Sequence, residues 1–322
     1  MAIYTKLNKE NIEEILLNYS IGQLKKFKGI EDGIENTNYF LLVNSKKYIL
    51  TIYEKRVKEK DLPFFSDLMT GLNEAYFKCP VPIKNKNNQA ISKYRNKNLM
   101  IVSFLDGEAK NILSPDNCKS LGEEVARMHL ITKNFKIQRH NDLSVNSWRR
   151  LFDQVKDKCV NIHKDLPKLI EANLIDVEKK WPKDLPKGII HADLFSDNIF
   201  FKYDKFNGII DFYFSCNDFY ALEIAICFNA LCFDGPKNNL SFNVTKANNF
   251  MKGYSKLKKL NDSEKKNMKI LSQGSALRFL LTRVFDAINT VEGAIVKIKD
   301  PMEYLVRLEF HKNAKNFEDY FF

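Results

Sequence analysis

The sequence predicts an α+β protein with two lobes, a small antiparallel β-sheet lobe over residues 1–105 and a mainly α-helical lobe over residues 106–322. Short apolar runs separated by turn residues dominate the chain before Asp106-Gly107, as is typical of strands. Beyond that dipeptide, apolar residues recur at helical spacing over much longer segments. The length of 322 residues fits this division, since a domain usually holds about 100–200 residues.

The first lobe is expected to begin with a short helix and continue as a meander. Asn8 is a good N-cap, and the apolar residues behind it follow helical spacing at Ile12, Ile15, Leu16 and Tyr19. Strand-like runs come next, at residues 24–30, 38–43 and 47–53. The turn-rich stretch 29–38 joins the first two, and Asn44-Ser45 joins the second to the third. Runs joined in this way predict neighbouring antiparallel strands.

A second helix is expected before the first lobe ends. Asp61 should cap it and Pro63 suits its first turn. One face of this helix carries Phe64, Phe65, Leu68, Met69 and Leu72. A last strand is expected at residues 99–104, which places the end of the lobe near residue 105.

The second lobe should consist of helices interrupted by three short strands. The first helix starts at Ser114-Pro115, and the others are expected at residues 148–160, 166–180, 219–233, 242–257 and 263–290. The strands are expected at residues 188–191, 199–203 and 208–212. A tight hairpin at residues 203–207 would bring Asp211, at the end of the third strand, back beside the loop between the first two.

Composition narrows the class of protein. Lys and Arg number 51 against 40 Asp and Glu, so the formal charge is +11, and a positive field attracts anions such as nucleotides. Basic residues are not interleaved with aromatic ones in a recognisable RNA-binding motif, so no nucleic-acid partner is expected. No run approaches the roughly 18 apolar residues of a membrane helix, and no apolar signal region opens the chain, so we expect a cytoplasmic protein without a membrane partner. The six cysteines lack C-x-x-C spacing and are expected to be reduced and buried.

One segment carries the chemistry. Two apolar strand runs bracket a polar loop with Asp193 and Asn198 five positions apart, and a third run ends in Asp211. Phosphoryl transfer needs a carboxylate to orient the attacking hydroxyl and take its proton, and oxygen ligands to hold Mg²⁺ on the phosphates. We therefore expect Asp193 to be the catalytic base and Asn198 and Asp211 to be the metal ligands. The alternative is that the acidic residues only cap turns. His191 is expected to pack and hydrogen-bond within the loop.

These residues resemble a known family. His191-x-Asp193-x4-Asn198, followed by Ile210-Asp211-Phe212, is similar to the catalytic and metal segments of the aminoglycoside phosphotransferase and choline kinase superfamily. A narrower resemblance, to bacterial homoserine kinases of that superfamily, covers nearly the whole chain, at residues 48–54, 61–65, 121–129, 210–214, 299–304 and 310–311. It implies a protein-kinase-like two-lobed fold with a nucleotide-binding N-terminal lobe. It also implies phosphorylation of L-homoserine to O-phospho-L-homoserine, with ATP and Mg²⁺, on the route to threonine.

The resemblance also implies nucleotide-binding residues in the first lobe. Backbone amides at Gly29 and Gly33 would approach the triphosphate, with Asn38 at the end of the same loop. Ser103, Phe104 and Leu105 would connect the lobes beside adenine, although Phe104 is expected to place its ring in the core. Protein kinases carry a phosphate-binding Lys on the third strand, and here Thr51 matches that position. The sequence leaves open which cation replaces it, with Lys55 and Arg56 nearby.

Substrate residues are inferred from the chemistry of homoserine. Its carboxylate calls for an Arg and its ammonium for a carboxylate, and Arg283 and Asp286 lie three apart on one expected helix. The same spacing is typical of an ordinary intrahelical ion pair. Asp193 would contact the acceptor hydroxyl, and Tyr213 could line the pocket. Two alternatives stay open: a sister kinase for choline, ethanolamine, an aminoglycoside or methylthioribose, and a kinase-like basic binding protein. The oligomeric state cannot be read from the sequence.

Overall fold

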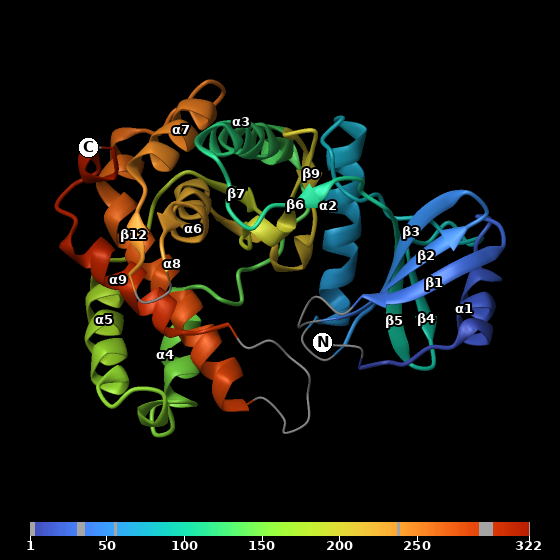
Figure 1. The fold of residues 1–322 in the computed structure, drawn as a ribbon, viewed down its shortest axis with the longest axis horizontal. Helices are drawn as coiled ribbons and strands as arrows, with labels where there is room; N and C mark the ends of the chain where they lie inside the picture. The colour runs from blue at the N-terminus through green and yellow to red at the C-terminus, as the bar shows by residue number, and fades with distance from the viewer. Residues whose placement is uncertain (1–3, 31–35, 55–56, 237–238, 290–298, 322) are drawn as a thin grey trace. The chain divides into compact units, whose positions relative to one another are not determined.

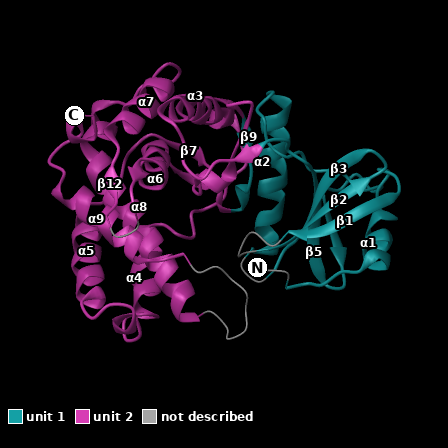
Figure 2. Cartoon of the chain, viewed as in Figure 1, with its two compact units in different colours: residues 1–107, 207–213, 291–297 teal, residues 108–206, 214–290, 298–322 magenta. Residues whose placement is uncertain are grey.

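The computed structural model describes residues 4–30, 36–54, 57–236, 239–289 and 299–321 (Figure 1). The chain forms two compact units, which are described separately (Figure 2). Unit 1 contains the described residues up to Gly107 together with Asn207–Tyr213. Unit 2 contains Glu108–Phe206 and the described residues from Phe214 onward. The first change of unit falls at Gly107, against residue 105 in the sequence prediction, and the return of Asn207–Tyr213 to unit 1 was not predicted.

Unit 1 is built on a five-stranded antiparallel sheet in the order β1-β2-β3-β5-β4. Its strands are β1 (Leu24–Ile30), β2 (Thr37–Val43), β3 (Lys46–Ile52), β4 (Ile91–Tyr94) and β5 (Lys97–Ser103). The predicted meander and the last strand are confirmed, but β4 was missed because it is short and carries few apolar residues. Its turn into β5 is held by Arg95 and Asn96, whose φ angles of 46° and 64° suit a two-residue hairpin.

Helices lie on opposite sides of this sheet (Figure 1). Helix α1 (Lys9–Leu16) begins with Asn8, whose side chain accepts from the amide of Asn11, as the predicted N-cap requires. Its buried residues join inward-facing sheet residues such as Leu41 and Leu50 in one core. Helix α2 (Leu62–Glu74) buries the predicted apolar face. Asp61 occupies its N-cap position but makes no capping bond through its side chain, so that part of the prediction is wrong.

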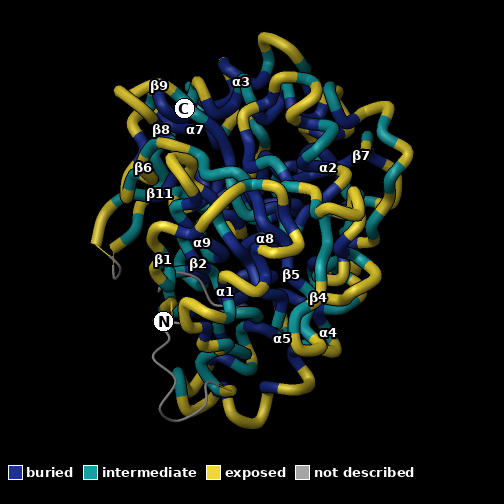
Figure 3. Tube along the Cα trace, turned by 90° about the vertical axis from the view of Figure 1, so that its right-hand side faces the viewer, coloured by how far each residue is buried: buried dark blue, intermediate teal, exposed yellow. Residues whose placement is uncertain are grey.

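Unit 2 is mainly helical. Its helices are α3 (Pro115–Ile131), α4 (Val145–Asp153), α5 (Leu166–Lys180), α6 (Tyr220–Leu231), α7 (Val244–Tyr254), α8 (Asp262–Asn289) and α9 (Met302–Asn313). Helix α8 packs against α4, α5, α6 and α9, and its trace is largely buried (Figure 3). Helix α4 ends at Asp153 rather than at residue 160, because exposed polar residues at 156–158 interrupt its apolar face before the short turn Cys159–Asn161. Helix α9 was not predicted.

Short strands lie between these helices. They are β6 (Glu108–Ala109), β7 (Lys187–Ile190), β8 (Ile199–Lys202), β9 (Lys205–Ile209), β10 (Cys216–Phe219), β11 (Phe233–Asp234) and β12 (Ser241–Phe242). Strand β7 pairs with β10, and β6, β8 and β9 form a sheet in that order. Tyr203 and Asp204 make the predicted tight turn between β8 and β9, with φ angles of 51° and 60°.

Helices α3 and α7 pack unusually closely through two glycines. A Cβ atom at Gly122 would lie 2.0 Å from the carbonyl oxygen of Phe250, and one at Gly253 would lie 1.9 Å from that of Lys119. His129 of α3 also contacts Tyr254 of α7, with 3.0 Å between Nδ1 and the phenol oxygen. The absence of a side chain at both glycines is therefore what allows this helix pair to form.

The remaining structural predictions concern cysteines and membrane helices. All six cysteines are buried and carry free thiols, as predicted. Within the described ranges, no helix is long and apolar enough to cross a membrane.

Candidate active site

The loop between β7 and β8 brings Asp193 and Asn198 together in unit 2. Asn198 ends the short 3₁₀ turn Ser196–Asn198 and is 8% exposed. Its Nδ2 donates to the backbone oxygen of Asp193 at 2.8 Å and to the carboxylate Oδ2 of Asp193 at 3.3 Å. The loop therefore closes on itself and presents a carboxylate next to an amide, as the spacing predicted.

His191 has a structural role in this loop. Its ring is fully buried, and its Nδ1 accepts from the amide of Asp193 at 3.3 Å. Its backbone oxygen accepts from the hydroxyl of Ser215 at 3.4 Å. The prediction that His191 packs and hydrogen-bonds within the loop matches these contacts.

Two charged residues that support the loop were missed. Glu223, on α6, is fully buried and accepts the amides of His191 and Ala192. Arg278, on α8, is 4% exposed and donates from Nη1 to the carbonyl oxygen of Ala192 at 2.7 Å. Burial raises the pKa of Glu223 to about 8, while the two amide donors and Arg278 act in the opposite direction. The available signal was a single acidic residue in the otherwise apolar run of α6.

Asp211 belongs to unit 1 and does not end a strand. Strand β9 covers Lys205–Ile209 instead of the predicted 208–212, because the two-residue turn at Tyr203-Asp204 starts the strand early. Asp211 follows in a left-handed conformation with φ 64°, just before the short turn Phe212–Phe214. Its charge raises the pKa of both Tyr53 and Tyr213, whose burial has the larger effect in the same direction.

The expected nucleotide-loop residues lie at the ends of β1, β2 and β3. Gly29 is paired with Tyr39, and Asn38 is paired with Thr51. The hydroxyl of Thr51 donates to Oδ1 of Asn38 at 2.8 Å, and Thr51 is 2% exposed. Gly33 lies outside the described residues, as do Lys55 and Arg56. Asn38 and Thr51 are therefore hydrogen-bonded neighbours on adjacent strands, and the Thr51 side chain is buried.

The expected adenine segment follows β5. Ser103 exchanges two bonds with Val81, one through its backbone amide at 2.8 Å and one through its hydroxyl at 2.9 Å. The half-buried ring of Phe104 packs edge-on against Phe40, with 5.7 Å between ring centroids. Leu105 lies against the backbone of Gly208. The ring of Phe104 thus packs within unit 1, as expected for its side chain.

The expected substrate residues fall in both units and are described in each unit separately. Tyr213 belongs to unit 1, where its ring packs against Tyr53 at 5.2 Å and Phe65 at 5.6 Å between centroids. Arg283 of α8 belongs to unit 2, and its Nη1 is 2.9 Å from the carboxylate of Glu303 on α9. The same nitrogen donates to the backbone oxygen of Asp300 at 2.7 Å. Asp286 is half-buried on α8. Arg283 thus joins α8 to the start of α9.

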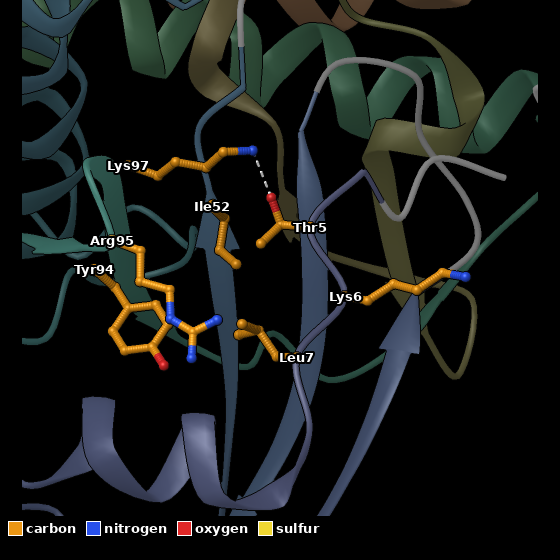
Figure 4. Close-up of a pocket in the computed structure, with 7 residues that line it drawn as sticks. All are labelled: Thr5, Lys6, Leu7, Ile52, Tyr94, Arg95 and Lys97. Carbon is orange, nitrogen blue, oxygen red and sulfur yellow. Dashed lines mark hydrogen bonds between the residues drawn. The ribbon is translucent and has the colours of Figure 1, made fainter.

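A small cavity of about 160 Å³ in unit 1 is lined by cationic side chains, but it lies on the face of the sheet opposite to Thr51. It is lined by Thr5, Lys6, Leu7, Ile52, Tyr94, Arg95 and Lys97 (Figure 4). Leu7 and Ile52 belong to the core beneath α1, whereas Thr51 points to the opposite face. Lys97 donates to Thr5 at 2.7 Å and pairs with Glu54 at 2.5 Å. Lys97 therefore does not substitute for a cation at Thr51.

The donor set suits a hard cation. Nδ2 of Asn198 is used by Asp193, and within the described residues Oδ1 of Asn198 has no hydrogen-bond partner. Mg²⁺ is usually bound by one or two carboxylates together with phosphate and water oxygens. No group of three His, Cys, Asp or Glu side chains in the described part of the chain forms a complete metal cage by itself. The Oδ1 of Asn198 is an oxygen donor of the kind that such a cation binds beside phosphate oxygens.

Comparisons with known proteins agree with this chemistry. The model of the phosphotransferase enzyme family matches residues 26–245. A protein named homoserine kinase from Parvibaculum lavamentivorans is 43% identical and aligns over 98% of this chain and 97% of its own length. Homoserine kinases from Rhodopseudomonas palustris and Agrobacterium fabrum are 44% and 40% identical, each over 99% of this chain and 97% and 98% of their own lengths. The predicted resemblance is confirmed.

Solved structures confirm the fold. Amicoumacin kinase in complex with AMP-PNP and Ca²⁺ has a TM-score of 0.71 at 12% identity, covering 97% of this chain and 95% of that one. Choline kinase from Cryptosporidium parvum has a TM-score of 0.66 at 14% identity, covering 95% and 94%. At these identities the likeness concerns the fold, and the predicted kinase-like α+β fold is confirmed. Together with the family match and the relatives, this shows that the chain belongs to the phosphotransferase enzyme family.

Proposed function

We propose that this protein is a homoserine kinase, which transfers the γ-phosphoryl group of ATP to the side-chain hydroxyl of L-homoserine. The products are O-phospho-L-homoserine and ADP, on the route to threonine, and the reaction takes place in the cytoplasm. The observation that carries the proposal is identity of 40–44% over nearly the full length to proteins named homoserine kinase. The adjacent Asp193 and Asn198 provide the proton acceptor and the metal ligand that a kinase reaction needs.

Asp193 is the catalytic base of the proposed reaction. Its carboxylate orients the hydroxyl of homoserine toward the γ-phosphorus and accepts the proton as the new O–P bond forms. The amide of Asn198, 3.3 Å from Oδ2, fixes the direction of that carboxylate. The hydrogen bond from Asn198 to the backbone oxygen of Asp193 keeps the loop closed during the reaction.

Asn198 and Asp211 are the proposed ligands of the divalent cation, taken as Mg²⁺. When bound with ATP, the cation would offset the negative charge that gathers on the phosphates during transfer. Asn198 offers Oδ1 because its Nδ2 is already engaged by Asp193. Asp211 offers a carboxylate, and it lies two residues after the end of β9 in a left-handed conformation with φ 64°.

The other binding roles follow the family resemblance. Gly29, Gly33 and Asn38 would meet the phosphates, with Thr51 holding Asn38 in place through its 2.8 Å bond. Ser103, Phe104 and Leu105 would offer backbone groups to adenine. Arg283 and Asp286 would recognise the two charges of homoserine and Tyr213 would line the pocket. Because Arg283 already pairs with Glu303, its side chain would have to share its charge between that partner and the substrate carboxylate.

An acceptor panel tests the proposal. Purified protein would be given ATP and Mg²⁺ with homoserine, choline, ethanolamine, an aminoglycoside or methylthioribose, and ADP release would be measured with mass detection of the phosphorylated product. Phosphorylation of homoserine at the highest kcat/KM is expected. Transfer to another acceptor but not to homoserine would overturn the proposal in favour of a sister kinase. Absence of turnover with every acceptor, together with salt-sensitive binding of nucleic acid, would favour a basic binding protein.

The Asp193→Asn variant tests the role of the base. It should lower kcat by about 100-fold or more while ATP binding persists, because a proton acceptor is lost and the rest of the loop is kept. Asp197→Asn is the matched control, since Asp197 is exposed in the same loop and pairs with Lys299 at 3.1 Å. An exposed pair contributes about 0–1 kcal/mol, so the control should change kcat less than about fivefold. Equal effects of both variants would remove Asp193 from the role of base.

A further inference from the structure

The backbone of the catalytic loop is held in a conformation that its residues do not favour. Ala192, which precedes Asp193, has φ 66° and is 1% exposed. A left-handed conformation is unfavourable for a residue with a side chain, and such a residue persists only where its surroundings hold it. The turn at Ala192 also decides which way the next residue, Asp193, leaves the strand β7. Groups that hold this turn therefore influence the direction of the Asp193 side chain.

Glu223 holds the turn from one side. Its Oε2 accepts from the amide of His191, and its Oε1 and Oε2 lie 3.1 and 3.3 Å from the amide of Ala192. Two consecutive amides therefore point at one fully buried carboxyl group. Buried amides need an acceptor, and this acceptor sits on α6, outside the loop.

Arg278 holds the same residue from the other side. Its guanidinium donates to the carbonyl oxygen of Ala192 at 2.7 Å and lies 4.5 Å from the ring of Phe279. Its positive charge also stabilises the ionised form of Glu223. Both polar groups of Ala192 are thus bonded to buried side chains, one from α6 and one from α8.

Glu223 and Arg278 lie on different helices, and each of them bonds a backbone group of Ala192, the residue directly before Asp193. We propose that Glu223 and Arg278 are positioning residues, which lock the left-handed turn at Ala192 and thereby aim the carboxylate of Asp193 at the acceptor hydroxyl. This inference rests on the proposed function only in taking Asp193 as the base.

Two variants test the pair. Glu223→Gln keeps the shape but places an NH₂ group opposite one of the two amide donors, and Arg278→Met keeps the length of the side chain but removes the bond to Ala192. Each should lower kcat at least about tenfold while KM for ATP changes little, because the base is misdirected and the nucleotide loops in unit 1 are untouched. Each should also speed hydrogen exchange in the peptide that spans residues 187–198.

Glu264→Gln is the matched control. Glu264 is also buried in unit 2, at 1% exposure, but its Oε2 accepts the amide of Asn261 at the start of α8. This control should lower stability without changing kcat per folded molecule or exchange in residues 187–198. Unchanged kcat and exchange in a folded Glu223→Gln or Arg278→Met protein would overturn the proposal.

The exchange measurement separates this inference from the proposed function. If the wild-type protein fails to phosphorylate homoserine, the acceptor identified by the panel replaces it in the kinetic measurement. Exchange in residues 187–198 still reports whether the turn is held. If Glu223→Gln fails to fold, Arg278→Met decides the question alone, since a neutral side chain of similar length remains in the core.

Discussion

Two buried histidines and one buried glutamate should make the free energy of unfolding of unit 2 depend on pH, and the histidines and the glutamate should act in opposite directions. Burial lowers the pKa of both His129 and His311 to about 3, from an ordinary 6.5. Burial raises the pKa of Glu223 to about 8, from an ordinary 4.5. The perturbation is a change from about pH 7 to about pH 5, which crosses the interval in which the folded and unfolded chains bind different numbers of protons.

The histidines make the folded unit sensitive to acid. Below its ordinary pKa the unfolded histidine binds a proton, while the folded one stays neutral until about pH 3. The free energy of unfolding therefore falls as the pH is lowered through this range. Between about pH 7 and about pH 5, each histidine should lower it by about 2 kcal/mol. The ring of His311 lies between Tyr320 and Asn229, with Nδ1 3.1 Å from the phenol oxygen and Nε2 3.0 Å from Oδ1 of Asn229.

Glu223 acts with the opposite sign. The folded glutamate keeps its proton up to about pH 8, while the unfolded one loses it above about pH 4.5, so lowering the pH stabilises the fold. Over the same interval Glu223 should raise the free energy of unfolding by about 2–3 kcal/mol. The wild-type protein should therefore lose only about 1–2 kcal/mol between the two pH values.

Single variants separate the contribution of Glu223 from the contribution of the histidines. Glu223→Gln should lose about 4 kcal/mol between the two pH values, while His311→Gln or His129→Gln should show almost no net loss. Urea unfolding followed by tryptophan fluorescence is a suitable assay, because both tryptophans of the chain belong to unit 2. Comparing the two pH values within each variant cancels the packing cost of the substitution itself.

The exposed His163 provides the matched control. A change in pH dependence in His163→Gln as large as that in His311→Gln would contradict burial as the cause. The reasoning is refuted if Glu223→Gln and wild type show the same difference between the two pH values. It is equally refuted if neither histidine variant reduces the loss.

Further predictions concern single contacts. Gly253→Ala should destabilise unit 2 by about 1–3 kcal/mol in urea unfolding, since its Cβ would lie 1.9 Å from the carbonyl oxygen of Lys119. Asp211→Ala should abolish the Mg²⁺-dependent part of the thermal shift given by an ATP analogue, and an unchanged shift would remove Asp211 from the metal site. Tyr203→Val should cost about 1 kcal/mol in thermal unfolding, because a β-branched residue disfavours φ 51°. Arg283→Ala should lower the melting temperature by removing the 2.9 Å pair with Glu303, and an accompanying rise in KM for homoserine would support its substrate role.

Much of the fold could be predicted because local patterns agree with the tertiary structure. Asn8 and Ser114 cap their helices as their sequences indicate, and the apolar face of α2 is the face that is buried. Errors arose where the apolar pattern alone was followed. Residues 209–212 look like a strand, yet the turn at Tyr203-Asp204 sets the register and the chain leaves the sheet after Ile209. A short polar strand such as β4 forms because β5 offers it a partner, which no local pattern reveals.

The candidate site shows a similar division. The five-residue spacing of Asp193 and Asn198 could be interpreted from the sequence because a loop between two strands forces such residues together. Glu223 could not be assigned in this way. It lies some 30 positions along the chain, and its importance comes from the two amides that meet it in the folded state. A charged residue inside an apolar helix is worth noting in any sequence, but only the fold identifies its partner.

The cation expected beside the phosphates is a further case in which the partners of a side chain are known only from the fold. The side chain at the third-strand position is Thr51, whose hydroxyl donates to Asn38 on the neighbouring strand, so this position carries a hydrogen bond in place of a charge. Lys97 pairs with Glu54 on the other face of the sheet. Arg278 donates a hydrogen bond to the carbonyl oxygen of Ala192, and Arg283 forms a salt bridge with Glu303. In the proposed function, the side chain that binds the phosphates is either one of these cations, released from its partner when the substrates bind, or another lysine or arginine of the chain. Lys55 and Arg56 are candidates by position, because they follow shortly after Thr51 in the sequence.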